Sequence, residues 1–245
     1  MRPKKRVGLI VPAGNTTIEV DFYEHLSQIA TVHATRIAGP SGVESEEGMD
    51  LFNLHIERAA NELARAKVDV VVYGFTTGSF YRGQQFTQEL LNRISKTAGV
   101  PAVTPSSAIL KALHFLNAKR IFIVTPYTVW NNTVLINYLQ ETDYKIVGLK
   151  GDSRNPAQAI KTPLWNQEPE EIVEHISAVD IPPKVDVLLC PCTAWRTVEV
   201  IEELEKIVKI PVITANQAVI WETALLLKKQ LITQKLGKLC RITED

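Results

Sequence analysis

Three short motifs occur twice in this chain, in the same order and at a nearly constant separation. The first copy reads VGLIVP (7–12), DVVVYGFTTGS (69–79) and VPAVTPSSAIL (100–110), and the second reads IFIVTP (121–126), DVLLCPCTAWR (186–196) and IPVITANQAVI (210–220). The separation is 114 residues from Pro12 to Pro126, 117 from Thr76 to Thr193 and 110 from Pro101 to Pro211. This repeat predicts two copies of one half-domain, with a site in the cleft between them.

The composition narrows the classes of partner. Of the 245 residues, 45% are hydrophobic, and 27 basic side chains balance 27 acidic ones. Zero net charge argues against nucleic acid or an anionic membrane surface as the main partner, and no apolar run approaches the length of a bilayer span. Three cysteines, an odd number, do not suggest a disulfide framework, so we expect a reducing, cytoplasmic location with thiols free for chemistry.

Short runs of Val, Ile and Leu alternate with longer amphipathic segments. The expected strands are Val7–Val11, Val32–Ile37, Val68–Tyr73, Ala102–Thr104, Arg120–Val124, Lys145–Gly148, Val185–Cys190 and Val212–Thr214, and the expected helices are Leu51–Ala66, Gln84–Thr97, Ser106–Leu116, Val198–Val208 and Gln217–Leu231. Continuous apolar strands between helices predict an α/β fold with parallel sheets covered on both faces.

The repeat divides this fold into two pseudo-symmetric flavodoxin-like halves, each a four-stranded parallel sheet flanked by helices. We expect an N-terminal half over residues 1–117, joined by the helix around 217–231, and a C-terminal half over residues 118–216. Ligands of such sheets bind beyond the carboxyl ends of the strands. Two polar segments, Ala38–Asp50 and Gly151–Glu168, are either solvated loops or a pair of flaps over the cleft, and Pro169 fits the start of a helix after the second.

The strand ends carry a thiol and several hydrogen-bond donors. Cys192 follows the strand VDVLLCP and could act as a nucleophile or a proton donor, or could be a small buried hydrophobic residue. We expect Cys190 to face the core and Cys240 to be incidental, and no nearby histidine completes a zinc set around Cys190 and Cys192.

Thr76 and Thr77 offer hydroxyl and backbone donors that suit a carboxylate or an oxyanion, or else cap the helix expected after Phe80. Asn15 after the first strand and Tyr127 after the fifth offer an amide and a phenol, although the tyrosine could simply pack. The five histidines lie away from the strand ends. The chain has no GxGxxG, Walker A, HExxH or CxxC motif, so no cofactor and no metal are expected, and the partner is predicted to be a small anionic ligand.

On these residues the chain resembles the aspartate/glutamate racemase superfamily, in its branch of maleate cis-trans isomerases and arylmalonate decarboxylases. VPAGNTTIE looks like the isomerase opening with its substrate-binding asparagine, here Asn15, and SFYRG (79–83) looks more like the decarboxylase. VTPY and the Cys-Thr pair fit both, which implies a binding role for Tyr127 and a catalytic role for Cys192. One departure stands out, because isomerases read YGCTSGS where this chain reads YGFTTGS, so Phe75 replaces the first catalytic cysteine.

The resemblance implies a cofactor-independent decarboxylase of a malonate-type diacid. One carboxylate would bind Thr76, Thr77, Tyr127 and the Thr193 backbone, and the other would lose CO₂ in an apolar pocket near Val43 before Cys192 delivers a proton. Pro12 and Phe75 are also expected at the pocket, where Phe75 would leave little room for an aryl group. Two alternatives remain open: a one-cysteine isomerase or racemase of a small diacid, and a non-catalytic diacid-binding protein. The chain could be a monomer or a homo-oligomer.

Overall fold

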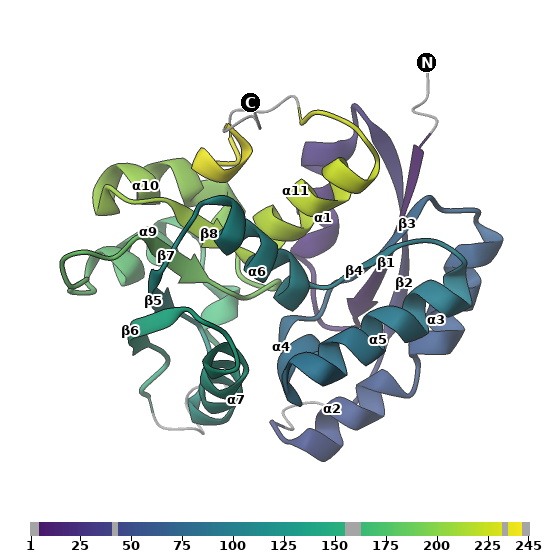
Figure 1. The fold of residues 1–245 in the computed structure, drawn as a ribbon, viewed down its shortest axis with the longest axis horizontal. Helices are drawn as coiled ribbons and strands as arrows, with labels where there is room; N and C mark the ends of the chain where they lie inside the picture. The colour runs from purple at the N-terminus through teal and green to yellow at the C-terminus, as the bar shows by residue number, and fades with distance from the viewer. Residues whose placement is uncertain (1–4, 41–43, 155–162, 232–234, 242–245) are drawn as a thin grey trace.

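Two four-stranded parallel sheets form the framework of the protein. The computed structural model describes residues 5–40, 44–154, 163–231 and 235–241 (Figure 1). The first sheet has the order β2-β1-β3-β4 and the second the order β6-β5-β7-β8. The strands are β1 (Lys5–Pro12), β2 (Ala30–Ile37), β3 (Val70–Tyr73), β4 (Ala102–Val103), β5 (Arg120–Val124), β6 (Lys145–Lys150), β7 (Val187–Cys190) and β8 (Val212–Thr214). All eight expected strands and the α/β class are therefore confirmed.

Helices cover both sheets. They are α1 (Ile18–Leu26), α2 (Glu46–Asn53), α3 (Ile56–Arg65), α4 (Thr76–Phe80), α5 (Gly83–Ala98), α6 (Pro105–Phe115), α7 (Val129–Gln140), α9 (Pro169–Ser177), α10 (Ile201–Val208) and α11 (Ala215–Leu226), with short 3₁₀ turns η1 (Leu164–Asn166), η2 (Thr197–Val200) and η3 (Lys238–Cys240). As Figure 1 shows, α6 and α11 lie side by side between the two sheets, and α11 contacts β3 of the first and β8 of the second.

The sequence repeat is visible in local detail. β3 and β7 are each four residues long and are related by the same offset of 117 that separates Thr76 from Thr193. At the start of each, an aspartate accepts backbone N–H groups from the neighbouring strand segment, Asp69 from Arg6 and Asp186 from Arg120, both at 2.8 Å. The two sheets are thus built from the same local interactions.

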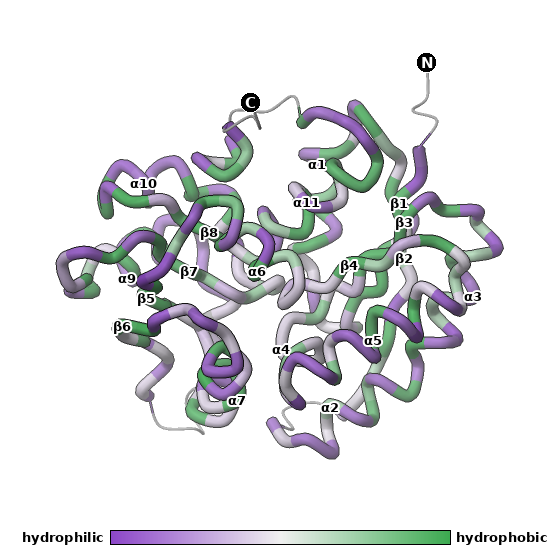
Figure 2. The backbone as a smooth tube through the Cα atoms, in the orientation of Figure 1, coloured by the Kyte–Doolittle hydropathy of each residue, from purple (hydrophilic) through white to green (hydrophobic). Residues whose placement is uncertain are grey.

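The hydrophobic core joins the halves rather than separating them. One continuous cluster of buried side chains runs from β1 and β3 through α1, α6 and α11 into the whole second sheet, while a smaller cluster lies beneath α3 and α5. Figure 2 shows the outer helices α3, α5 and α10 alternating between polar and apolar residues, as expected for helices that bury one face. Because one core spans both sheets, the strand ends of the two halves are held at a fixed separation.

Several helix boundaries differ from the expectation. The predicted helix Leu51–Ala66 is two helices, α2 and α3, which are interrupted at residues 54–55. α2 begins five residues early, because the Ser45 side chain accepts from the Gly48 N–H (3.1 Å) and two glutamates occupy its positively polarised first turn. The last five residues of the polar segment Ala38–Asp50 are therefore helical rather than loop. α11 ends at Leu226, earlier than expected.

The helices α1 and α7 were not predicted. α1 carries buried Asp21 and His25, and α7 carries buried Asn131 and Asn132, so neither shows a clean apolar stripe. α9 does begin at Pro169, where Glu168 and Glu171 form a capping box. The proposed domain boundary at residues 117–118 stays a prediction. Among the described residues, no helix is long and apolar enough to cross a membrane.

Candidate functional site

The carboxyl ends of β1, β3, β5 and β7 meet where the two halves face each other. The Asn15 amide nitrogen donates to Thr193 Oγ1 (3.2 Å), and Thr193 Oγ1 donates in turn to the Gly74 carbonyl (3.1 Å). Thr17 Oγ1 donates to the Ala194 carbonyl (2.9 Å). Three segments far apart in sequence are therefore hydrogen-bonded to one another around the turn that carries Cys192.

The Cys192 side chain is enclosed, with 5% of its surface exposed. Burial raises the pKa of its thiol to about 11, while the backbone N–H groups of Ala194 and Trp195 and the nearby Tyr127 phenol act in the opposite direction. The thiol is therefore neutral at physiological pH, and several donors surround its sulphur. Such a group can deliver a proton and then be stabilised as a thiolate.

Tyr127 lies near Thr76 and Thr77, and these three side chains form a polar surface that we call the donor wall. The Tyr127 hydroxyl donates its single hydrogen to the Pro191 carbonyl (2.5 Å), and Thr76, Thr77 and Cys192 lie close enough to influence its pKa. Burial raises the pKa of the phenol well above its usual value, so Tyr127 is a neutral donor at every physiological pH. The structure brings these predicted residues together at one place.

Thr76 presents an unsatisfied hydroxyl in this wall. The side chain is 1% exposed, and its Oγ1 has no hydrogen-bond partner among the described residues. Thr76 and Thr77 form the first turn of α4, and the helix that begins after Phe80, α5, has Arg82 at its N-cap, so neither threonine caps it. Because leaving a buried hydroxyl unpaired costs free energy, Thr76 Oγ1 is a candidate contact for a polar ligand group.

Phe75 turns toward the first half of the molecule. Its ring makes an edge contact with Phe52 of α2 (centroids 5.1 Å apart, 66° between planes) and a tilted contact with Tyr73 (6.2 Å). A Cβ placed on Gly78 would lie 2.5 Å from the Phe75 ring, so α4 passes directly over it. The aromatic side chain fills space at the tip of β3, where the matching position of β7 holds a thiol.

Asn15 has a structural task that the sequence did not reveal. Its Oδ1 accepts the backbone N–H groups of Thr17 (2.9 Å) and Ile18 (3.1 Å), which stabilises the start of α1. One of its two amide hydrogens goes to Thr193, so a substrate-binding role remains a prediction for the other. Pro12 ends β1 and is half-buried, and its carbonyl accepts from the Asn15 N–H. Val43 lies outside the described residues.

The two polar segments approach the site from opposite halves. Glu44, in the first, accepts a hydrogen bond from Thr128 of the second half. In the second segment, Gln167 accepts from the Trp195 indole N–H (3.2 Å), three residues after Cys192. Residues 155–162 of this segment lie outside the described part, so a lid role is a prediction.

One histidine lies closer to the site than expected. His175 of α9 makes an edge contact with Trp195 (centroids 6.1 Å apart), and burial lowers its pKa. The other residues that sequence reasoning missed are Asp21 and Asn216. Asn216 belongs to the second copy of the repeated motif, but Ser106 stands at its matching position, so the repeat drew no attention to it.

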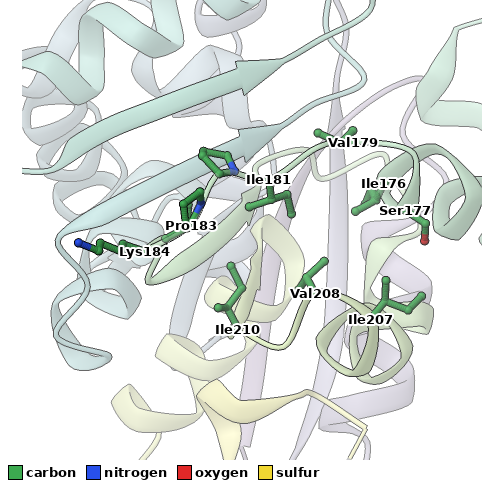
Figure 3. A pocket seen from close by; sticks show the side chains of 11 residues that line it. Ile176, Ser177, Val179, Ile181, Pro183, Lys184, Ile207, Val208 and Ile210 are labelled. Atoms are coloured by element: carbon green, nitrogen blue, oxygen red, sulfur yellow. The ribbon is translucent and has the colours of Figure 1, made fainter.

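An open pocket lined mainly by aliphatic side chains lies at the amino ends of β7 and β8, on the other side of the second sheet from Cys192. Figure 3 shows it lined by Ile176, Ile181, Val208 and Ile210, which precede the amino ends of β7 and β8. Cys192 lies beyond the carboxyl end of β7, so this pocket is separate from Cys192 and the donor wall. Within the described ranges, no group of three or more His, Cys, Asp or Glu side chains could hold a metal ion.

Comparisons with known proteins agree with this geometry. A model of the arylmalonate decarboxylase family matches residues 7–240. The chain is 25% identical over 225 residues to a maleate isomerase of Pseudomonas putida (86% of each chain) and 26% identical over 220 residues to an arylmalonate decarboxylase of Bordetella bronchiseptica (88% of each). The solved maleate isomerase of Pseudomonas putida S16 superimposes with a TM-score of 0.86 at 22% identity, covering 96% of this chain and 98% of the other, which shows that the fold is shared.

Proposed function

Because the chain belongs to the arylmalonate decarboxylase family, an enzyme family whose relatives include maleate isomerases, we propose that it decarboxylates a small malonate-type diacid without a cofactor. The observation that carries the proposal is a single buried, neutral thiol beside a wall of neutral donors. At the matching strand end, Phe75 replaces the second thiol that a two-cysteine mechanism requires.

The substrate carboxylate that remains in the product would bind the donor wall. Thr76 Oγ1 and Thr77 would supply neutral donors, and the Tyr127 hydroxyl would become a third by turning its single hydrogen from the Pro191 carbonyl to the substrate; the unpartnered state of Thr76 Oγ1 supports this assignment. Donors aimed at a developing oxyanion contribute about 3–4 kcal/mol each in well-studied enzymes. Negative charge builds on the oxygens of the retained carboxylate when the enediolate forms. The donor wall would therefore stabilise the enediolate more than the ground-state carboxylate.

The proposed reaction consists of carbon–carbon bond cleavage followed by proton transfer. The bond between the α-carbon and the second carboxylate breaks, CO₂ leaves, and the electron pair stays on the substrate as an enediolate. The Cys192 S–H then transfers its proton to the α-carbon, and the resulting thiolate regains a proton from solvent. Because Cys192 lies on one side only, a malonate with two different α-substituents would yield a single enantiomer. The raised pKa of Cys192 suits a proton donor, which must be protonated before transfer.

Phe75 and Phe52 would restrict the substituent. Their edge contact occupies the tip of β3 on the first half. We infer that the substrate carries hydrogen or a short alkyl group rather than an aryl ring. This distinguishes the chain from the arylmalonate activity in the family's name.

A one-cysteine isomerase of a small diacid is the second candidate. It is favoured by the 25% identity to maleate isomerases and by the Asn15-Thr16-Thr17 opening. One solved relative, the Pseudomonas putida S16 isomerase with a Cys-to-Ala substitution, holds maleate. An isomerase of this kind would add a Cys192 thiolate to the double bond, which the raised thiol pKa disfavours.

The test is incubation in D₂O with methyl-, dimethyl- and phenylmalonate, maleate, and amino and hydroxy diacids, following CO₂ and proton NMR together. CO₂ release with deuterium at the α-carbon of a small monoacid is the expected result. Conversion of maleate to fumarate without CO₂ would replace the proposal with the isomerase. Binding detected by thermal shift without turnover of any compound would instead indicate a non-catalytic diacid-binding protein.

A further inference from the structure

A buried carboxyl group connects the first half to the turn that carries Cys192. Asp21, on α1, is 3% exposed, and Asn216, in the first turn of α11, is fully buried. The Asn216 amide nitrogen donates to Asp21 Oδ2 (2.7 Å) and to the Thr193 carbonyl (3.0 Å). Buried polar groups are costly unless they are paired, so this linked set needs a reason beyond packing.

The orientation of the Asn216 amide is determined by its two acceptors. The Thr193 carbonyl can only accept, so the amide must present its nitrogen on that side. The second hydrogen of the same nitrogen then points at Asp21, and Asn216 Oδ1 is left without a partner among the described residues. The Asn216 amide is therefore held in an orientation that leaves its own Oδ1 without a hydrogen-bond partner among the described residues.

The Thr193 carbonyl is one end of a rigid peptide unit whose other end is the Ala194 N–H. The unit is planar and trans, so the carbonyl and the N–H point in opposite directions. Asn216 holds the carbonyl, and the Ala194 N–H, two residues after Cys192, lies close enough to the sulphur to lower the pKa of the thiol. Rotation of this peptide would turn the N–H away from the sulphur, where a donor is needed most once the thiol has given up its proton.

The first half has no equivalent of this linkage. The offset of 110 places Ser106 opposite Asn216, and its hydroxyl bonds to Ser79 Oγ (2.9 Å) rather than to a strand-end carbonyl. The offset of 114 places the apolar Leu135 opposite Asp21. Among the described residues, the Asp–Asn pair therefore reaches only the strand end that holds the thiol, as expected if it serves the thiol rather than the shared fold.

We propose that Asp21 and Asn216 are positioning residues that orient the Thr193–Ala194 peptide so that its N–H stabilises the Cys192 thiolate. The inference rests on the proposed function only in treating Cys192 as the proton donor. The charged groups that face Asp21 are Glu199 in η2, Glu24 on its own helix, and Arg196 at the start of η2. They act on Asp21 rather than on the thiol, so a change in the thiol on substitution of Asn216 would act through the peptide.

The test compares Asn216→Leu and Asp21→Leu with the conservative Asp21→Asn, which keeps an oxygen that can accept from Asn216. The first readout needs no substrate: the rate at which iodoacetamide alkylates Cys192 between about pH 7 and pH 11, assigned by mass spectrometry of the 185–196 peptide in a Cys240→Ser background. We expect the two Leu variants to be alkylated about tenfold more slowly, as for loss of one hydrogen bond to a charged atom, and Asp21→Asn to stay within about twofold.

The second readout is turnover of the substrate found in the D₂O screen. The Leu variants are expected to lose about tenfold in kcat with KM within about threefold, because the donor wall for the carboxylate stays intact. Unchanged alkylation in a folded Asn216→Leu variant, or an equal loss in Asp21→Asn and Asp21→Leu, would overturn the proposal. If no diacid is turned over but the alkylation pattern holds, the proposed function fails while the positioning role stands.

Discussion

The strand ends that follow β3 and β7 share their local structure and a threonine, but the residue before that threonine is Phe75 in one and Cys192 in the other. Each strand is four residues long, starts after an aspartate that accepts backbone N–H groups, and is followed by a threonine at the matching position. Beyond β3, Phe75 turns its ring onto Phe52, and Thr76 keeps an unpartnered hydroxyl. Beyond β7, Cys192 is enclosed, and Thr193 is bonded to Asn15 and Gly74.

This difference separates two tasks that a symmetric pair of thiols would share. In the proposed mechanism, the β3 end would offer donors to a bound anion, and the β7 end would offer one proton. In a two-cysteine enzyme each end does both, and the carbon can be approached from either face. With one thiol, protonation becomes one-sided, which suits decarboxylation better than racemisation.

The largest effect on turnover is expected from removing the Cys192 thiol. Cys192→Ala is expected to abolish turnover, a loss of more than about 10³-fold, while ligand binding stays within about an order of magnitude because the donors remain. The measurement is CO₂ release beside calorimetric binding. Cys190→Ala is the matched control, since Cys190 is an equally buried thiol two residues earlier; full activity in Cys192→Ala would eliminate every thiol-based mechanism.

Thr76→Val tests the hydrogen-bond donors at the end of β3. It removes a hydroxyl but keeps the shape, so kcat/KM should fall by about 10²-fold, the range seen for one oxyanion donor. Because Thr76 Oγ1 has no partner in the ligand-free protein, Tm should be unchanged or higher. Thr223→Val is the matched control, since Thr223 Oγ1 is also buried and unpartnered but lies further along α11. An equal loss of activity in both variants would contradict the assignment.

Phe75→Cys would restore the symmetry of the two strand ends. We expect it to add weak isomerase or racemase activity on a small diacid, measurable by exchange of the α-proton from both faces. The substitution removes the edge contact with Phe52, so it should also lower the free energy of unfolding by about 1–3 kcal/mol. Phe75→Gly serves as its control, because it makes similar space without a thiol. No gain in either variant would show that more than the thiol separates this chain from the isomerases.

A pH dependence of stability is expected from Asp21, the buried carboxyl group that reaches the β7 end through Asn216. Burial raises the pKa of Asp21 from 3.8 to about 7, so the folded protein binds this proton more tightly than the unfolded chain. The free energy of unfolding therefore falls as pH rises from about 4 to about 7 and levels off above that range. Asp21→Asn should remove this slope. Between about pH 4 and pH 7, the free energy of unfolding of the variant should therefore rise by on the order of 4 kcal/mol relative to that of the parent. Urea unfolding at pH 4.5, 6 and 8 measures it, and parallel curves for the two proteins would show that Asp21 titrates normally.

Much of the fold could be predicted because it depends on local pattern. Continuous apolar runs such as VVVY and VLLC predict buried strands wherever they occur, and all eight were found. Helix ends were less predictable, since α2 begins at a serine cap inside a segment that is too polar to suggest a helix. α1 was missed because Asp21 and His25 interrupt its apolar face, and this interruption is what reaches Asn216.

The sequence by itself determined the repeat, the two sheets, and the fact that one strand end carries a thiol and the other a phenylalanine. Only the tertiary structure decided that Phe75 packs onto Phe52, that burial keeps Cys192 neutral, and that Asp21 reaches Thr193 through Asn216. The reason is distance along the chain: Asn15 bonds to a residue 178 positions away, and Asp21 to one 195 positions away. Local pattern specifies each strand end separately, whereas burial and pairing arise only where the two halves meet.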